Sequence, residues 1–135
     1  MRRLVLALLV VILLGATGCG PGEQPPLANT SWKLTGWAAA SPPPVKLTMT
    51  AEFGAGTLSG SAGINNFSGT FVSEIDGSLT IRLGPMTLMG GPEADMQAES
   101  TYLARLGAAR GYRIDGNTLV LSDADRKDSL TFTRA

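Results

Sequence analysis

Short runs of alternating apolar and polar residues cover most of the chain after residue 27, and a period of two is the pattern of half-buried β-strands. In residues 46–53, one face would hold Leu47, Met49, Ala51 and Phe53, with charged or hydroxyl-bearing residues between them. Further alternating runs contain Trp32 and Leu34, Phe67 and Phe71, Leu79 and Ile81, Tyr112 and Ile114, Leu119 and Leu121, and Leu130 and Phe132. Glycines, asparagines and prolines separate many of these runs. The pattern predicts a sheet of about 7–9 short antiparallel strands.

One segment, residues 93–106, departs from this alternation and is predicted to be a helix. Gly84 and Pro85 are expected to end the strand before it, because proline cannot donate to a strand ladder. Pro92 suits the first turn of a helix, and Gly107 or Gly111 suits the end of the helical region. The expected fold class is therefore α+β, a curved antiparallel sheet with one helix packed over its open side.

The helix is expected to turn one apolar face toward the sheet. Met96, Leu103 and Leu106 share that face, with Tyr102 beside them. Glu99 interrupts the apolar stripe and is expected at its solvent-exposed edge. The alternative for Glu99 is a hydrogen bond to a group in a neighbouring loop.

The first part of the chain, residues 1–18, has the features of a lipoprotein signal peptide. Arg2 and Arg3 provide a positive start, and residues 4–14 form an apolar run too short for a transmembrane helix of about 20 residues. Small residues then lead to Cys19, the only cysteine, in a pattern that resembles a bacterial lipobox. The Cys19 thiol is the predicted attachment site for a diacylglyceryl group. An ordinary signal peptide, with Cys19 incidental, is the alternative.

Lipidation of Cys19 would anchor the protein to a membrane without spanning it. Residues 19–26 are rich in Gly, Pro, Glu and Gln and are expected to form a flexible tether. The folded domain is expected to occupy residues 27–135. The predicted location is the bacterial cell envelope. Gly20, in place of an aspartate after Cys19, favours the periplasmic face of the outer membrane if the cell is Gram-negative.

The chain lacks several residue types that common mechanisms need. It contains no histidine, which excludes Ser-His-Asp and Cys-His mechanisms and the usual zinc sites. Cleavage before Cys19 leaves nine basic and eleven acidic residues, a formal charge of about −2. Without a basic stripe, nucleic acid is not an expected partner. A non-enzymatic protein without a cofactor is predicted.

A metal ion is not an expected ligand either. Asp123, Asp125 and Asp128 invite a calcium interpretation, but an EF-hand loop needs a central glycine and a bidentate glutamate, which are missing here. A solvated turn is the expected role of this segment.

Residues 60–69 combine three glycines with two adjacent asparagines and carry no charge. Glycine and asparagine tolerate the positive φ that tight turns demand, so a turn between two strands is expected. The functional alternative is a pocket floor made of backbone amides and side chains, with Asn65, Asn66 and Ser68 as candidate binding residues.

The same stretch resembles the GxxGCNxxSG signature of the META/HslJ-type domain family, whose members are small bacterial envelope domains. Residues 87–92 are similar to the family's second motif, T-R-M-A-C-P, and residues 27–34 to its entry motif, L-x-x-T-x-W-x-L. The resemblance extends from about residue 27 to residue 135. It implies a curved antiparallel sheet like a cracked barrel, with a packed helix.

Two positions depart from the family pattern. The family cysteines would fall at Ile64 and Gly91, and the resemblance implies that those cysteines form a disulfide in relatives that have them. The two turns should then remain neighbours in this chain, with Ile64 packed over Gly91 in place of the covalent bond.

The resemblance also implies an association with envelope stress or the heat-shock response, through contacts with an envelope protein that the sequence does not name. The alternative function is binding of a small hydrophobic ligand or a lipid in a cavity inside the cracked barrel. Large residues such as Trp32, Phe53, Phe67 and Phe71 could fill that space, and a filled interior would favour protein contacts.

Overall fold

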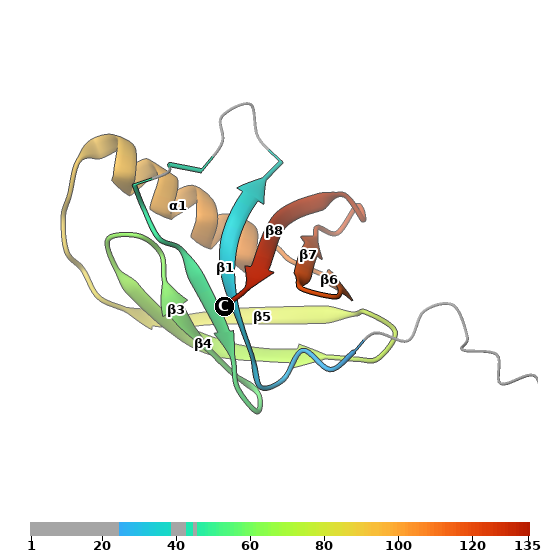
Figure 1. Cartoon of the computed structure of the whole chain (residues 1–135). Coiled ribbons are helices and arrows are strands. Elements are labelled where there is room, and N and C mark those ends of the chain that lie inside the picture. The colour runs from blue at the N-terminus through green and yellow to red at the C-terminus, as the bar shows by residue number, and fades with distance from the viewer. Residues whose placement is uncertain (1–24, 39–42, 45) are drawn as a thin grey trace, which may run out of the picture.

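The computed structural model describes residues 25–38, 43–44 and 46–135, and within them a single curved sheet packs against one helix (Figure 1). Eight antiparallel strands form the described sheet, so the predicted α+β class with a curved sheet is confirmed. The helix α1 spans Glu93–Gly107. The strands are β1 (Thr30–Trp37), β2 (Thr50–Phe53), β3 (Thr57–Ser61), β4 (Asn66–Ser73), β5 (Leu79–Met86), β6 (Gly111–Asp115), β7 (Thr118–Ser122) and β8 (Asp128–Arg134).

The strand order is β5-β4-β3-β2-β1-β8-β7-β6. Most neighbours are consecutive in the chain, but β1 pairs with β8, so that Leu34 lies opposite Phe132. The two outer strands approach each other at one end, where Ser78 and Gly111 form an isolated antiparallel bridge. The chain between β5 and β6 contains α1, which contacts both β5 and β8. The sheet therefore curls into a partly closed barrel, in which the outer strands β5 and β6 meet only at one end. The helix packs against this barrel.

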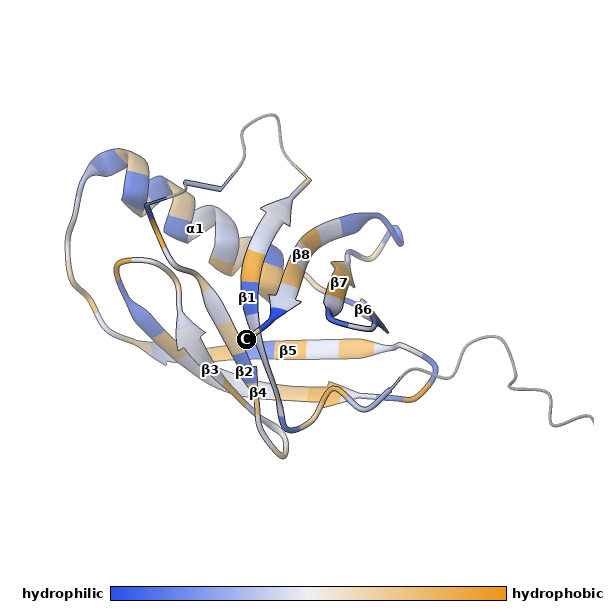
Figure 2. Cartoon of the chain, viewed as in Figure 1, coloured by the Kyte–Doolittle hydropathy of each residue, from blue (hydrophilic) through white to orange (hydrophobic). Residues whose placement is uncertain are grey.

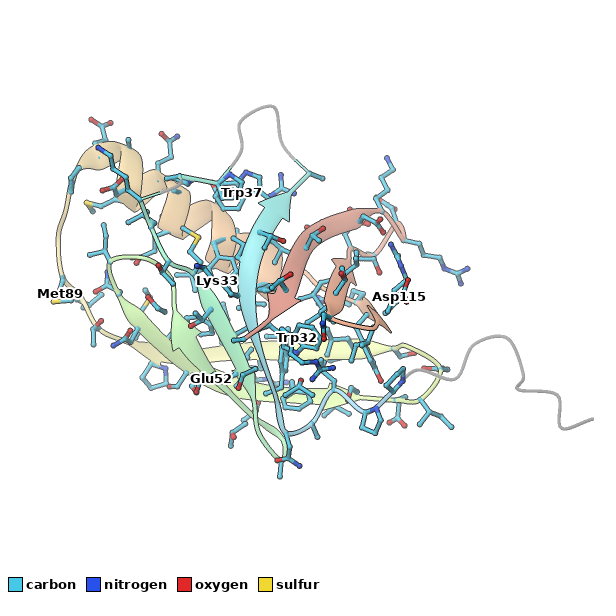
Figure 3. The ribbon with its side chains drawn as sticks, viewed as in Figure 1. Trp32, Lys33, Trp37, Glu52, Met89 and Asp115 are labelled. Atoms are coloured by element: carbon cyan, nitrogen blue, oxygen red, sulfur yellow. The ribbon has the colours of Figure 1, made fainter. Side chains whose placement is uncertain are left out.

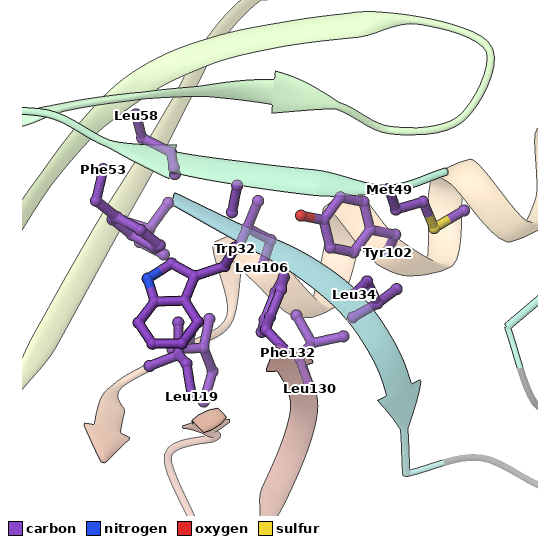
Figure 4. Close-up of a cluster of buried hydrophobic side chains, with 14 of the residues drawn as sticks. Trp32, Leu34, Met49, Phe53, Leu58, Tyr102, Leu106, Leu119, Leu130 and Phe132 are labelled. Atoms are coloured by element: carbon purple, nitrogen blue, oxygen red, sulfur yellow. The ribbon is translucent and has the colours of Figure 1, made fainter. Parts of the chain in front are cut away.

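Large side chains occupy the space between the sheet and the helix (Figure 4). Trp32, Phe53, Tyr102 and Phe132 are all almost completely buried. The Tyr102 hydroxyl donates a hydrogen bond of 2.9 Å to the Thr50 carbonyl, so its polar end is satisfied, and burial raises the pKa of this tyrosine. Large side chains, including Trp32 and Phe53, therefore fill the core between the sheet and the helix.

Alternation identified the strands correctly, although two of their boundaries differ from those expected (Figure 2). The strand expected at 46–53 is regular only from Thr50, yet Leu47 still packs against the core. β5 continues through Gly84 and Pro85 to Met86. Proline is tolerated there because β5 is an outer strand, where a missing N–H need not leave a neighbouring carbonyl unpaired.

The inward face of α1 also differs from the expected one. Met96 is 45% exposed, whereas Ala98, Glu99, Tyr102 and Leu106 are buried. The helix is therefore rotated so that Glu99 points into the protein. The expectation that Glu99 lies in water at the edge of the stripe is wrong, and its alternative, a bond to a loop, is the one observed.

Candidate functional site

Asn65 lies at the end of the turn between β3 and β4 and is only 4% exposed. Its side-chain oxygen accepts hydrogen bonds from the Thr87 hydroxyl (2.9 Å) and the Met89 N–H (2.6 Å). Its side-chain nitrogen donates to the Met89 carbonyl (3.0 Å) and to Glu99 Oε1 (2.7 Å). Both acceptor positions and both donor hydrogens of the amide are thus used. Asn65 connects the turn, the loop after β5 and the helix, and no part of its amide is left for a ligand.

Glu99 completes this connection from the helix side. Its Oε2 accepts hydrogen bonds from the Asn65 N–H (2.7 Å) and the Ile64 N–H (3.1 Å), while Oε1 accepts the one from the Asn65 side chain. Three N–H donors from the turn therefore converge on one carboxylate that is 7% exposed. We call Asn65, Glu99 and the backbone groups of Ile64 and Met89 bonded to them the Asn65–Glu99 junction.

Asn66 and Ser68 lie on the opposite side of β4 from the buried Phe67. The Ser68 hydroxyl donates to the Pro85 carbonyl (3.1 Å), and the backbone N–H of Asn66 donates to the Thr87 hydroxyl (3.0 Å). Each residue borders a different surface depression, of about 330 Å³ at Asn66 and about 430 Å³ at Ser68. The structure therefore does not bring the three candidate binding residues together, because Asn65 is buried while Asn66 and Ser68 are exposed.

The structure does bring Ile64 and Gly91 together. A β-carbon added to Gly91 would lie 2.6 Å from Ile64 Cδ1 and 3.3 Å from Ile64 Cγ1. The Ile64 side chain thus occupies the space that any side chain at position 91 would need. Cys19, the predicted lipidation site, lies outside the described residues.

This contact gives a prediction for a pair of substitutions. Gly91→Ala should lower the free energy of unfolding by about 1 kcal/mol, because the new methyl group would overlap the Ile64 Cδ1 atom. Ile64→Val removes that atom, so the double variant should lose less than the sum of the two single variants. Urea denaturation of all four chains measures this coupling. Strictly additive losses would show that Ile64 does not touch the methyl group introduced at position 91.

The loop at residues 87–91, which we call the Leu88 loop, combines a fixed backbone with exposed apolar side chains. Its backbone is held by Asn65 at both the N–H and the carbonyl of Met89. Leu88 is nevertheless 91% exposed and Met89 58% exposed. Met89 lies at the end of the molecule from which α1 starts (Figure 3). The backbone of the Leu88 loop is therefore fixed next to two apolar side chains that remain in water.

A polar depression of about 590 Å³ lies at the other end, beside the β4–β5 hairpin and the start of β6. Arg113 and Asp128 form an exposed ion pair there at 3.1 Å, which lowers the pKa of Asp128 and raises that of Arg113. Charges of both signs line this depression, so it has no strong preference for an anion or a cation. Its charged residues are Asp76, Arg110, Arg113, Asp123, Arg126 and Asp128.

The described residues contain neither a membrane-spanning helix nor a cluster of metal ligands. None of the helices there is long and apolar enough to cross a membrane. Within the same ranges, no group of three or more His, Cys, Asp or Glu side chains is placed to hold a metal ion.

The chain is similar to a known family and to solved structures. The model of a family described as META domain matches residues 25–135. A protein from Burkholderia xenovorans, solved by NMR, is 24% identical with a TM-score of 0.64, over 81% of this chain and 83% of that one. A DUF4847 family protein from Bacteroides vulgatus is 17% identical with a TM-score of 0.54, over 78% of this chain and 92% of that one. These structural similarities concern the fold, and no curated protein matches the chain.

Proposed function

Since the chain belongs to the META domain family, we propose that it is a lipid-anchored, non-catalytic protein of the bacterial envelope that acts by binding another envelope protein. The META domain is not a known enzyme family. Support for the anchor comes from the sequence, in which the only cysteine follows an apolar run and a series of small residues. The family resemblance supports an association with envelope stress or heat shock.

The Leu88 loop is the observation that carries the protein-contact part of this proposal. An exposed leucine on a mobile loop would lose conformational freedom on binding, which weakens association. Here two hydrogen bonds between the Asn65 side chain and the backbone of Met89, one donated by Asn65 and one accepted by it, already fix the residue next to Leu88. The partner would be a protein with an apolar depression that accepts Leu88 and Met89.

The test places a photo-activated crosslinking amino acid at position 88 of the full chain in cells of the source bacterium. We expect membrane-associated protein and one discrete crosslinked adduct. Thr80, exposed on β5, is the control position and should give no such adduct. Met89→Glu should abolish the adduct at position 88, because a charge would enter the apolar contact. The thermal unfolding midpoint of the protein should stay unchanged, because residue 89 is exposed.

Two further outcomes complete the test. Cys19→Ser should release the protein from the membrane fraction and remove acyl groups from its intact mass. An unchanged membrane fraction in that variant would contradict the anchor. Adducts of equal yield at positions 80 and 88, or adducts unaffected by Met89→Glu, would contradict the binding role of the Leu88 loop.

A further inference from the structure

The chain enters the folded domain beside the tip of the β4–β5 hairpin (Figure 1). The Tyr112 hydroxyl lies 3.2 Å from the Pro25 carbonyl oxygen and 3.1 Å from the Glu74 carbonyl oxygen, so one phenol joins the start of the domain to the hairpin. Leu27, two residues later, is completely buried. The point at which the domain leaves its preceding segment is thus fixed next to the hairpin.

The same hairpin carries two large apolar side chains in water. Val72 is 63% exposed near the end of β4, and Ile75 is 62% exposed in the turn that follows. Among the other exposed large apolar residues of the described chain, Met86 ends β5 and Met96 lies in the first turns of α1. The two most exposed, Leu88 and Met89, belong to the Leu88 loop, and Met89 lies at the opposite end of the molecule from the hairpin (Figure 3). The two exposed apolar sites therefore lie at opposite ends.

The length of chain between Cys19 and Pro25 limits how far the domain can be from an anchoring membrane. A fully extended chain covers at most about 3.3–3.6 Å per residue, so roughly 20 Å is the largest separation that these two residues can have. A domain held this closely has a high effective concentration at the lipid surface, and even a weak contact would be populated. The end that carries Pro25 is the one that would meet the lipid.

We propose that the tip of the β4–β5 hairpin is a membrane-contact surface on which Val72 and Ile75 enter the lipid headgroup region. This inference rests on the lipid anchor of the proposed function. Acidic Glu74 and Asp76 alternate with the apolar residues, and Arg110 and Arg113 lie near the hairpin. Charges of both signs suit zwitterionic headgroups, so the contact does not require anionic lipid. Docking at this end leaves the Leu88 loop facing away from the membrane.

The experiment uses the full lipidated chain carrying Ile75→Cys, purified and inserted into vesicles of phosphatidylethanolamine and phosphatidylglycerol. The introduced thiol is the only free one, because acylation occupies Cys19, and it is labelled with an environment-sensitive fluorophore. We expect a blue-shifted emission and a several-fold lower quenching rate by aqueous iodide than in detergent-free Cys19→Ser protein. Leu88→Cys is the matched control and should show the same quenching in both forms.

A second variant separates apolar insertion from mere closeness to the membrane. With the label at Val72→Cys, addition of Ile75→Asp should restore most of the iodide quenching, whereas Leu88→Asp, the same kind of change in the Leu88 loop, should leave the protection in place. Equal quenching at positions 75 and 88 in protein whose mass shows the acyl groups would overturn the membrane contact alone. Absence of acyl groups on Cys19 would overturn the anchor and the contact together.

Discussion

Glu99→Ala should lower the free energy of unfolding by about 3–5 kcal/mol, a large share of the stability of a small domain. The variant would leave the N–H groups of Ile64 and Asn65 and one hydrogen of the Asn65 amide without their acceptor. Each buried donor that loses its partner costs about 1–3 kcal/mol. Urea denaturation followed by tryptophan fluorescence provides the measurement, because Trp32 is completely buried.

Glu99→Gln distinguishes hydrogen bonding from the loss of side-chain volume. A glutamine at position 99 could accept from the two backbone groups, but its NH₂ would then face the NH₂ of Asn65. Asn65 cannot turn its amide over, because Thr87 and Met89 donate to its oxygen. We expect an intermediate loss of about 1–3 kcal/mol. Gln97→Ala, exposed on the same helix, is the control. A loss below about 0.5 kcal/mol in Glu99→Ala, typical of a surface site, would contradict the junction.

A disulfide between positions 64 and 91 should form on oxidation and raise the free energy of unfolding by roughly 3–4 kcal/mol. In a disulfide, the sulfur of one cysteine lies about 3 Å from the β-carbon of the other. A β-carbon at position 91 would be 3.3 Å from Ile64 Cγ1 and 3.8 Å from Ile64 Cγ2, the positions that the sulfur of a cysteine at 64 could take. The bond would close a loop with 26 residues between the two positions, which constrains the unfolded chain.

The double variant Ile64→Cys with Gly91→Cys is best studied in the Cys19→Ser background, where these thiols are the only two. Intact mass would establish the bond, and denaturation midpoints of oxidised and reduced protein would give its effect. The reduced form should be less stable than wild type, since it lacks the Ile64 contact. Failure to form the bond, or a lower midpoint after oxidation, would contradict the adjacency of the two turns.

Much of the fold follows from local patterns in the sequence. Alternation around Trp32, Phe67 and Phe132 located β1, β4 and β8, because one face of each strand is buried. Pro92 marked the start of α1 to within a residue, and the helix ends at Gly107, the first of the two glycines expected to end it. Gly84 and Pro85 misled the prediction for β5, since their effect depends on whether the strand is at an edge, and strand order is not a local property.

The junction could not be predicted in the same way. Glu99 and Asn65 are 34 residues apart, and nothing in their spacing indicates that they meet. A carboxylate on a helix is usually solvated, so the exposed edge was the natural expectation. Residues 60–69 did contain one indication. This stretch carries no charge, and the backbone N–H groups of its turn need hydrogen-bond acceptors from elsewhere in the chain. Met96 was assigned to the buried face for the same reason, because the rotation of α1 depends on Glu99 reaching that turn.

The pairing of β1 with β8 determines when the sheet can be completed during synthesis. Trp32 lies opposite Arg134, which is about a hundred residues later in the chain. Pairing these two strands therefore closes a long loop, and it can happen only after the last residues have been synthesised. β2 to β5 can pair as successive hairpins as they emerge, but one edge of β1 has no partner until residues 128–134 are available. A nascent chain of this domain therefore carries an open strand edge until β8 has emerged, and is exposed to mispairing for that whole interval.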